Sequence, residues 1–304
     1  MINKIILSII AKKMYDSNVI TPQEQQQKLA KAIGYDSLWF KREDLHPYGS
    51  HKGRSIPVMI DKYYTDGDRN FAISSSGNAA LAAALHVRKN YPDISLNIFV
   101  GNKINPDKHE ILKDLVSENI KVLIKERPLQ ALTQASNEGF RSLRQSFDDT
   151  SLIGYQSLAE EIMEIKDLGA VFIGTSSGTT AEALARTFVK NKRQIQVHII
   201  QTSSCHPIYD KFEAYDGPDE ISTADAIVDQ TAYRGLDLVP LIEKTGGHAW
   251  CATNENISAA KELVSKHTGL DVSTNSALSI VGAMQTMYQD YEINGSVLCM
   301  ICGK

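Results

Sequence analysis

Short apolar segments alternate with amphipathic segments along almost the whole chain, and this alternation restricts the fold more than any other feature of the sequence. The apolar segments are typical of buried strands and occur at 37–41, 71–74, 96–100, 121–124, 171–174, 196–201, 249–253 and 297–301. Apolar residues at helical spacing occur at 77–89, 109–118, 129–147, 158–167, 180–190, 256–267 and 276–291. Strands that alternate with helices form parallel sheets covered by helices. The sequence therefore predicts an α/β protein.

Charge and apolar content exclude two classes of partner. The 36 acidic and 32 basic residues give a net charge of −4 without a cluster of basic residues, so we expect no nucleic-acid partner. The apolar run 5–11 is much shorter than the roughly 18 residues of a membrane span, and we expect no membrane partner. Lys12 and Lys13 follow this run without a cleavage site, which favours a buried first element over a signal peptide.

Cysteine use and one long polar segment add two expectations. The four cysteines, Cys205, Cys251, Cys299 and Cys302, do not form a disulfide framework in a chain of 304 residues, so we expect a cytoplasmic protein. No histidine or cysteine spacing indicates a metal site. The polar segment 203–234 is predicted to be a long surface loop of the kind that is often functional.

Two turns join a strand to a helix and could bind anions. The first contains Ser75, Ser76, Gly77 and Asn78, and the second runs through Gly174, Thr175, Ser176, Ser177, Gly178 and Thr179. Hydroxyls and backbone N–H groups converge there at a helix N-terminus, where the helix dipole is positive. Neither turn is a P-loop or a dinucleotide fingerprint. One such turn alone could be a simple Ser/Thr helix cap, but two in successive α/β segments favour a binding role.

Lys52 follows a turn with Pro47 and Gly49 and lies between His51 and Gly53. A lysine in a shaped, partly desolvated turn can lose its proton and react with an aldehyde. Most lysines are ordinary surface residues, so the lysine becomes informative only together with the two anion turns.

Taken together, these segments resemble the fold type II pyridoxal-phosphate enzymes, the tryptophan synthase β-subunit-like superfamily, and within it the threonine synthase and serine/threonine dehydratase group. The matching motifs follow the family order: Thr21-Pro22, Lys41-Arg-Glu-Asp-Leu, Pro47-Tyr-Gly-Ser-His-Lys-Gly-Arg, Ser75-Ser-Gly-Asn-Ala, Gly154-Tyr-Gln-Ser, Gly174-Thr-Ser-Ser-Gly-Thr-Thr, Ser273-Thr-Asn-Ser-Ala and the strand up to Gly303. The resemblance implies two domains with the cofactor in the cleft between them. Residues 1–40 and 145–304 would form the larger, cofactor-binding domain, and 41–144 the smaller one, which carries the substrate loop.

The resemblance also assigns roles to single residues. Lys52 would be the catalytic lysine that holds pyridoxal 5′-phosphate covalently. The turn from Gly174 to Thr179 would bind the phosphate, and Cys302 would face the pyridine nitrogen. Ser75, Ser76, Gly77 and Gln156 would bind the substrate, a small amino acid, while Asn78 would contact both substrate and cofactor.

The sequence departs from the family pattern in three places. Its phosphate loop contains hydroxyl residues where relatives have more glycine, so phosphate contacts are expected to use hydroxyls. Ser273 stands where the family usually has glutamate. The sequence ends just past Cys302, where many relatives continue, which leaves open a missing tail or closure by a partner subunit.

The implied activity is an amino-acid lyase that catalyses β- or γ-elimination or replacement, with the Lys52 amine as the base that removes the α-proton. A neutral donor such as Cys302 at the pyridine nitrogen favours elimination and replacement over transamination. Two alternatives remain: a β-replacement enzyme of the cysteine synthase kind, and a catalytically silent relative that binds cofactor or a partner. A homodimer is expected as the commonest oligomer.

Overall fold

The computed structural model of the chain describes residues 19–102 and 106–303, with side chains left undescribed at 106–108. The described chain forms two compact units. The larger contains Pro22–Leu45, Gly49–His51 and residues 144–303. The smaller contains residues 19–21, His46–Tyr48 and Lys52–Leu143. The apolar run 5–11 lies outside the described residues.

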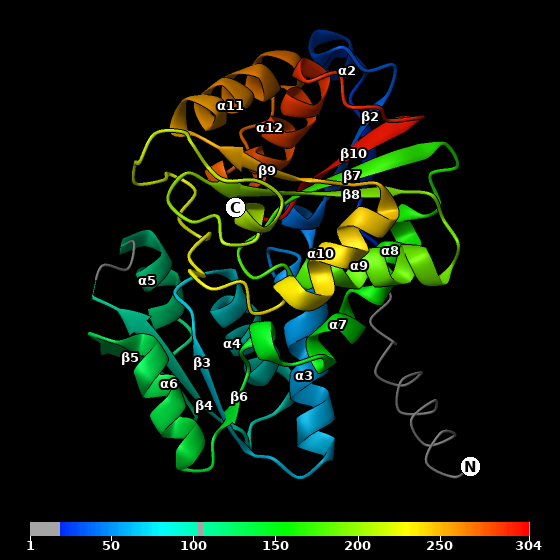
Figure 1. Cartoon of the computed structure of the whole chain (residues 1–304). Coiled ribbons are helices and arrows are strands. Elements are labelled where there is room, and N and C mark those ends of the chain that lie inside the picture. The colour runs from blue at the N-terminus through cyan, green and yellow to red at the C-terminus, as the bar shows by residue number, and fades with distance from the viewer. Residues whose placement is uncertain (1–18, 103–105, 304) are drawn as a thin grey trace. The chain divides into compact units, whose positions relative to one another are not determined.

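The larger unit is built on a six-stranded sheet in the order β1-β2-β10-β7-β8-β9 (Figure 1). Its strands are β1 (Gln23–Gln25), β2 (Leu38–Arg42), β7 (Leu168–Gly174), β8 (Gln196–Thr202), β9 (Ala249–Ala252) and β10 (Ser296–Ile301). Only β1 pairs antiparallel, and the other pairings are parallel. Ligands of α/β proteins bind at the carboxyl ends of parallel strands, so the residues after β7 and β10 are placed where a site is expected.

Helices cover both faces of this sheet. They are α2 (Gln27–Ile33), α7 (Thr150–Gly154), α8 (Gln156–Ile162), α9 (Thr179–Lys190), α10 (Gly235–Thr245), α11 (Asn254–Thr268) and α12 (Thr274–Tyr288), with short 3₁₀ turns η1 (Glu43–Leu45), η2 (Gln145–Phe147) and η3 (Tyr209–Lys211). Phe172 and Cys299 pack with α2, α11 and α12, whereas their neighbours Ile173 and Met300 pack with α8, α9 and α10. Figure 1 shows the two groups of helices on opposite sides of the sheet. The central strands are therefore buried on both faces, which explains their continuous apolar sequences.

The smaller unit has a parallel four-stranded sheet in the order β5-β4-β3-β6. Its elements are α3 (Lys52–Thr65), β3 (Asn70–Ser74), α4 (Asn78–Asn90), β4 (Ser95–Gly101), α5 (Pro106–Lys113), β5 (Ile120–Lys125), α6 (Pro128–Asn137) and β6 (Arg141–Ser142). Ile60 of α3, Ala83 of α4 and Leu112 of α5 belong to the cluster on one face. Leu132 and Ala135 of α6 pack on the other. The helices that begin at Lys52 and Asn78 thus share one core.

The predicted α/β architecture is confirmed, and all eight predicted strands are present within a few residues. The segment 203–234 is the predicted long loop, with only η3 as a regular helix. No helix in the described part of the chain combines the length and apolarity that a membrane span needs.

Several helix predictions were wrong or incomplete. The helix predicted at 129–147 ends at Asn137, because Gly139 adopts a left-handed φ of 93° that stops the helix. Helices α3 and α10 were missed, since each contains an internal proline (Pro57, Pro240) that usually marks a helix end. Strands β1 and β6 and helices α2 and α7 were missed because they are too short to show a period.

Candidate active site

The turn before Lys52 is tied to the end of strand β10. Ser50 forms an isolated β-bridge with Gly303, and the backbone N–H of His51 donates to the Cys302 carbonyl at 3.0 Å. The Nδ1 atom of His51 lies 2.9 Å from the same carbonyl. Because a carbonyl only accepts, Nδ1 carries the proton in this contact. The residue that precedes Lys52 is thus fixed by two hydrogen bonds to Cys302.

Lys52 itself is half-buried and is the first residue of α3. His51, one residue earlier, stacks on the buried ring of Tyr155 with 5.9 Å between ring centroids. Gln156 follows Tyr155 as the first residue of α8 and is half-buried.

The predicted substrate turn joins β3 to the thirteen-residue helix α4. Ser75 Oγ accepts the backbone N–H of Gly77 at 3.3 Å, while the Ser76 side chain is exposed. Asn78 begins the helix, and its first turn contains no acidic residue. The first N–H groups of a helix have no intrahelical acceptor, so this turn offers donors to a carboxylate.

The predicted phosphate turn joins β7 to α9 and contains no acidic side chain. Its fold is fixed from within: Gly178 N–H donates to Thr175 Oγ1 at 2.9 Å, and the Ser177 and Thr179 hydroxyls lie 2.8 Å apart. Gly178 has a left-handed φ of 84°, which favours glycine. Two hydroxyls and the first N–H groups of a twelve-residue helix form a donor set that fits a phosphate.

Gly174 and Ser176 join the same turn to other parts of the larger unit. A Cβ at Gly174 would lie 2.8 Å from Leu278 Cβ and 2.9 Å from the Asn275 carbonyl, so the glycine lets α12 approach β7. Ser176 Oγ accepts N–H groups from Val228 and Asp229 at 3.0 and 2.9 Å and donates to the Asp229 carboxylate at 3.3 Å. These contacts fill its hydrogen-bonding capacity, so phosphate contacts by Ser176 would come from its backbone N–H.

Cys302 follows the last residue of β10 and is buried, with 7% of its surface exposed. Beside it, the hydroxyls of Ser273 and Ser276 donate to the Gly303 carbonyl at 2.7 and 2.9 Å. Ser273 also caps α12 by accepting the Ser276 N–H. Ser273 and Ser276 therefore fix the chain around Cys302 at the carboxyl end of the sheet.

The four cysteines are free thiols. Cys299 and Cys302 belong to clusters on opposite faces of the sheet. Burial raises the pKa of the Cys299 thiol, which keeps it neutral. No group of three or more potential metal ligands occurs in the part of the chain that the structure describes.

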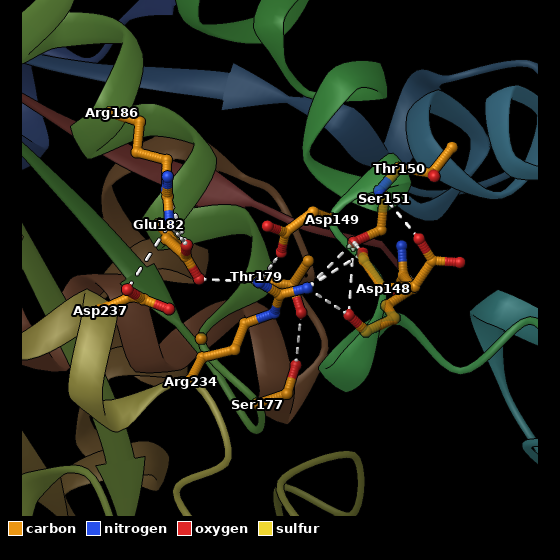
Figure 2. Close-up of polar contacts among 12 residues, drawn as sticks. Asp148, Asp149, Thr150, Ser151, Ser177, Thr179, Glu182, Arg186, Arg234 and Asp237 are labelled. Carbon is orange, nitrogen blue, oxygen red and sulfur yellow. Dashed lines mark hydrogen bonds and ion pairs between the residues drawn. The ribbon is translucent and has the colours of Figure 1, made fainter.

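Two polar clusters on the helices that follow these turns were missed in the sequence. In the smaller unit, His86 of α4 contacts the Tyr48 hydroxyl through Nδ1 at 3.1 Å and Asp61 of α3 through Nε2 at 2.6 Å. In the larger unit, Arg234 contacts Glu182 of α9 (Figure 2). Both clusters join residues far apart in the sequence, which no local motif signals.

The model of the family described as "Pyridoxal-phosphate dependent enzyme" matches residues 16–303. A threonine dehydratase from Nicotiana attenuata is 25% identical over 95% of this chain, and the chain spans about half of that relative (48%). A threonine synthase from Methanocaldococcus jannaschii is 23% identical, with 93% of this chain and 74% of the relative covered.

Solved structures share the fold. A pyridoxal 5′-phosphate-dependent aspartate racemase superposes with a TM-score of 0.80 at 19% identity, covering 97% of this chain and 94% of that one. The threonine deaminase isoform 2 of Solanum lycopersicum gives a TM-score of 0.80 at 20% identity, covering 97% and 88%. The resemblance predicted from the motifs is confirmed, and with a family model that extends over nearly its whole length, the chain belongs to the pyridoxal-phosphate-dependent enzymes.

Proposed function

We propose that the protein is an amino-acid lyase of the threonine synthase or serine/threonine dehydratase type. Pyridoxal phosphate, when bound, supplies the electron sink for reactions at the α-carbon of an amino acid. The Lys52 amine would hold the cofactor and then take the α-proton of the substrate. The turn at Ser75–Asn78 would bind the substrate carboxylate with its N–H and hydroxyl donors, and Gln156 would assist.

The observation that carries this proposal is the link between His51 and Cys302. The residue before Lys52 is hydrogen-bonded to the chain at Cys302, the proposed partner of the pyridine nitrogen. That partner is a thiol and not a carboxylate, and a neutral partner favours elimination or replacement over transamination. The sequence relatives named threonine dehydratase and threonine synthase support the same choice.

Product analysis tests the proposal. The cofactor-loaded protein is incubated separately with L-serine, L-threonine and O-phosphohomoserine, and the products are identified by mass. A dehydratase releases ammonia and a 2-oxo acid from serine or threonine. A threonine synthase converts O-phosphohomoserine and water to threonine and phosphate. Lys52→Ala is the control, and it is expected to abolish each reaction.

Other outcomes would replace the proposal. Turnover of O-acetylserine with sulfide to cysteine, without the reactions above, would identify a β-replacement enzyme. Cofactor binding without any turnover would identify a catalytically silent relative. A change of configuration at the α-carbon as the only reaction would identify a racemase, an activity named among the structural neighbours.

A further inference from the structure

A carboxylate is buried in the first turn of α9, directly after the proposed phosphate turn. Glu182 lies three residues beyond Thr179, and its side chain is 0% exposed. A phosphate at this helix N-terminus would lie close to the negative charge of Glu182. Two like charges close together in a buried site oppose each other, so anion binding here requires that Glu182 be neutralised.

Two arginines contact Glu182, and they differ in exposure. Arg186, one turn along α9, reaches Glu182 Oε1 at 2.6 Å but is 44% exposed. Arg234 reaches Glu182 Oε2 at 2.9 Å and is only 4% exposed. Water and salt screen the charge of an exposed side chain much more than that of a buried one. Arg234 is therefore the main neutralising partner of Glu182.

The same guanidinium fixes the segments around α9. Its NH2 group donates to the carbonyls of Gln145 and Asp148 at 2.7 and 3.0 Å, and NH1 donates to Asp149 at 3.1 Å. Figure 2 shows Arg234 between Glu182 on one side and the 148–151 segment on the other. Planar guanidinium groups hold several acceptors in fixed directions, which lysine does not do.

Arg234 also precedes α10, which packs on the phosphate turn. A Cβ at Gly178 would overlap the Cδ2 atom of Leu238 in α10, so the turn and this helix are in close contact. Arg234 contacts Glu182 and begins the helix that contacts Gly178. It thus constrains the turn from two directions.

We infer that Arg234 is a positioning residue for the cofactor phosphate, which acts by neutralising the buried Glu182 at the start of α9. The inference rests on the proposed function in one respect, the assignment of the phosphate to the Gly174–Thr179 turn. Arg234 would not itself touch the phosphate. Its effect is to leave the N-terminus of α9 free of opposing negative charge.

The test compares pyridoxal phosphate with pyridoxal, which has the same aldehyde and lacks the phosphate. Equilibrium dialysis of the full chain gives both dissociation constants, and the ratio of the pyridoxal constant to the pyridoxal-phosphate constant reports the phosphate site alone. Arg234→Gln is expected to lower this ratio at least tenfold. Arg186→Gln, the matched control on the same carboxylate, is expected to change it less than threefold. The double variant E182Q/R234Q, which removes both charges, is expected to return to within threefold of wild type.

Glu182→Gln alone keeps the shape of the side chain and removes its charge, so it is expected to raise the ratio at least threefold. If Arg234→Gln does not fold, Glu182→Gln tests the inference alone, and a wild-type ratio in Glu182→Gln then overturns the inference. A folded Arg234→Gln with a wild-type ratio overturns it, as does a double variant that stays as low as Arg234→Gln. A wild-type protein without preference for pyridoxal phosphate overturns the phosphate assignment and the inference together. A strong wild-type preference with unmoved variants overturns the inference alone.

Discussion

Gly178→Ala places a methyl group in the middle of the proposed phosphate turn. Gly178 has a φ of 84°, and its Cβ would overlap the Leu238 side chain. Leu238 is completely buried in the core formed with α8 and α9, so its methyl group has no free space into which to move. The substitution therefore combines backbone strain with overpacking.

Both contributions can be given a size. A non-glycine residue in the left-handed region costs about 1–2 kcal/mol, and overpacking a dense core costs about 1–3 kcal/mol. Gly178→Ala is expected to lower the free energy of unfolding by the sum, about 2–5 kcal/mol. Gly269 has a similar φ of 73° with nothing within 4 Å of its Cβ. Gly269→Ala should lose only the strain, about 1–2 kcal/mol.

Urea unfolding of the two variants measures this difference, and dialysis against pyridoxal phosphate measures the effect on the site. Gly178→Ala is expected to weaken cofactor binding at least tenfold, because the shifted turn loses phosphate hydrogen bonds. Gly269→Ala is expected to bind like wild type. Equal stability losses would show that Leu238 gives way easily, and wild-type affinity in Gly178→Ala would remove this turn from the phosphate site.

Four further expectations concern the remaining site residues and the core. Borohydride reduction of the loaded enzyme followed by peptide mapping is expected to place the cofactor adduct on Lys52, and an adduct elsewhere refutes the assignment. Ser76→Ala is expected to raise KM while the absorbance of the bound cofactor stays unchanged, and parallel loss of both would make the turn structural. Cys302→Ser is expected to keep most activity, whereas Cys302→Asp should lose elimination rate and gain slow transamination, and wild-type rates in the Asp variant would limit Cys302 to packing. Burial and the nearby His248 lower the pKa of His198 to about 3, so unfolding takes up a proton below pH 6.5. The free energy of unfolding therefore decreases as the pH is lowered, by up to about 1.4 kcal/mol per pH unit between pH 6.5 and 3. Urea unfolding of His198→Gln at pH 5 to 7 is expected to show a free energy of unfolding that changes less with pH than in wild type, and the same pH dependence in both would contradict this.

The elements that are determined by residues adjacent in the sequence could be predicted from the sequence. Strands such as β7 and β10 are buried on both faces, and their continuous apolar sequence identifies them directly. Helices α3 and α10 depend instead on tertiary packing that tolerates Pro57 and Pro240 inside them. The local pattern predicts that a helix ends at such a proline. In the structure α3 continues past Pro57, because the buried side chains of Ile56 and Met59 stabilise it on both sides of the proline.

The same limit applies to the site. The proposed phosphate turn is one continuous segment at a helix start, so the sequence alone suffices to propose it. Glu182 and Arg234 are 52 residues apart, and the arginine lies at the end of a long loop with no periodic pattern. The engagement of Ser176 with Val228 and Asp229 was hidden for the same reason. A sequence motif gives residue types, but only the structure of the 203–234 loop shows that the Ser176 hydroxyl is already hydrogen-bonded.

The hydrogen bonds between His51 and the Cys302 carbonyl determine how the Cys302 variants must be interpreted. His51 donates two hydrogen bonds to the backbone carbonyl of Cys302, and Ser50 pairs with the backbone of Gly303. Replacing the cysteine side chain leaves these backbone acceptors in place, so the turn before Lys52 should keep its position in Cys302→Ser and Cys302→Asp. A change in reaction type in these variants would then report the chemistry at the side chain and not a displaced lysine. His51→Phe provides the complementary case, because it removes the Nδ1 donor and leaves the thiol untouched.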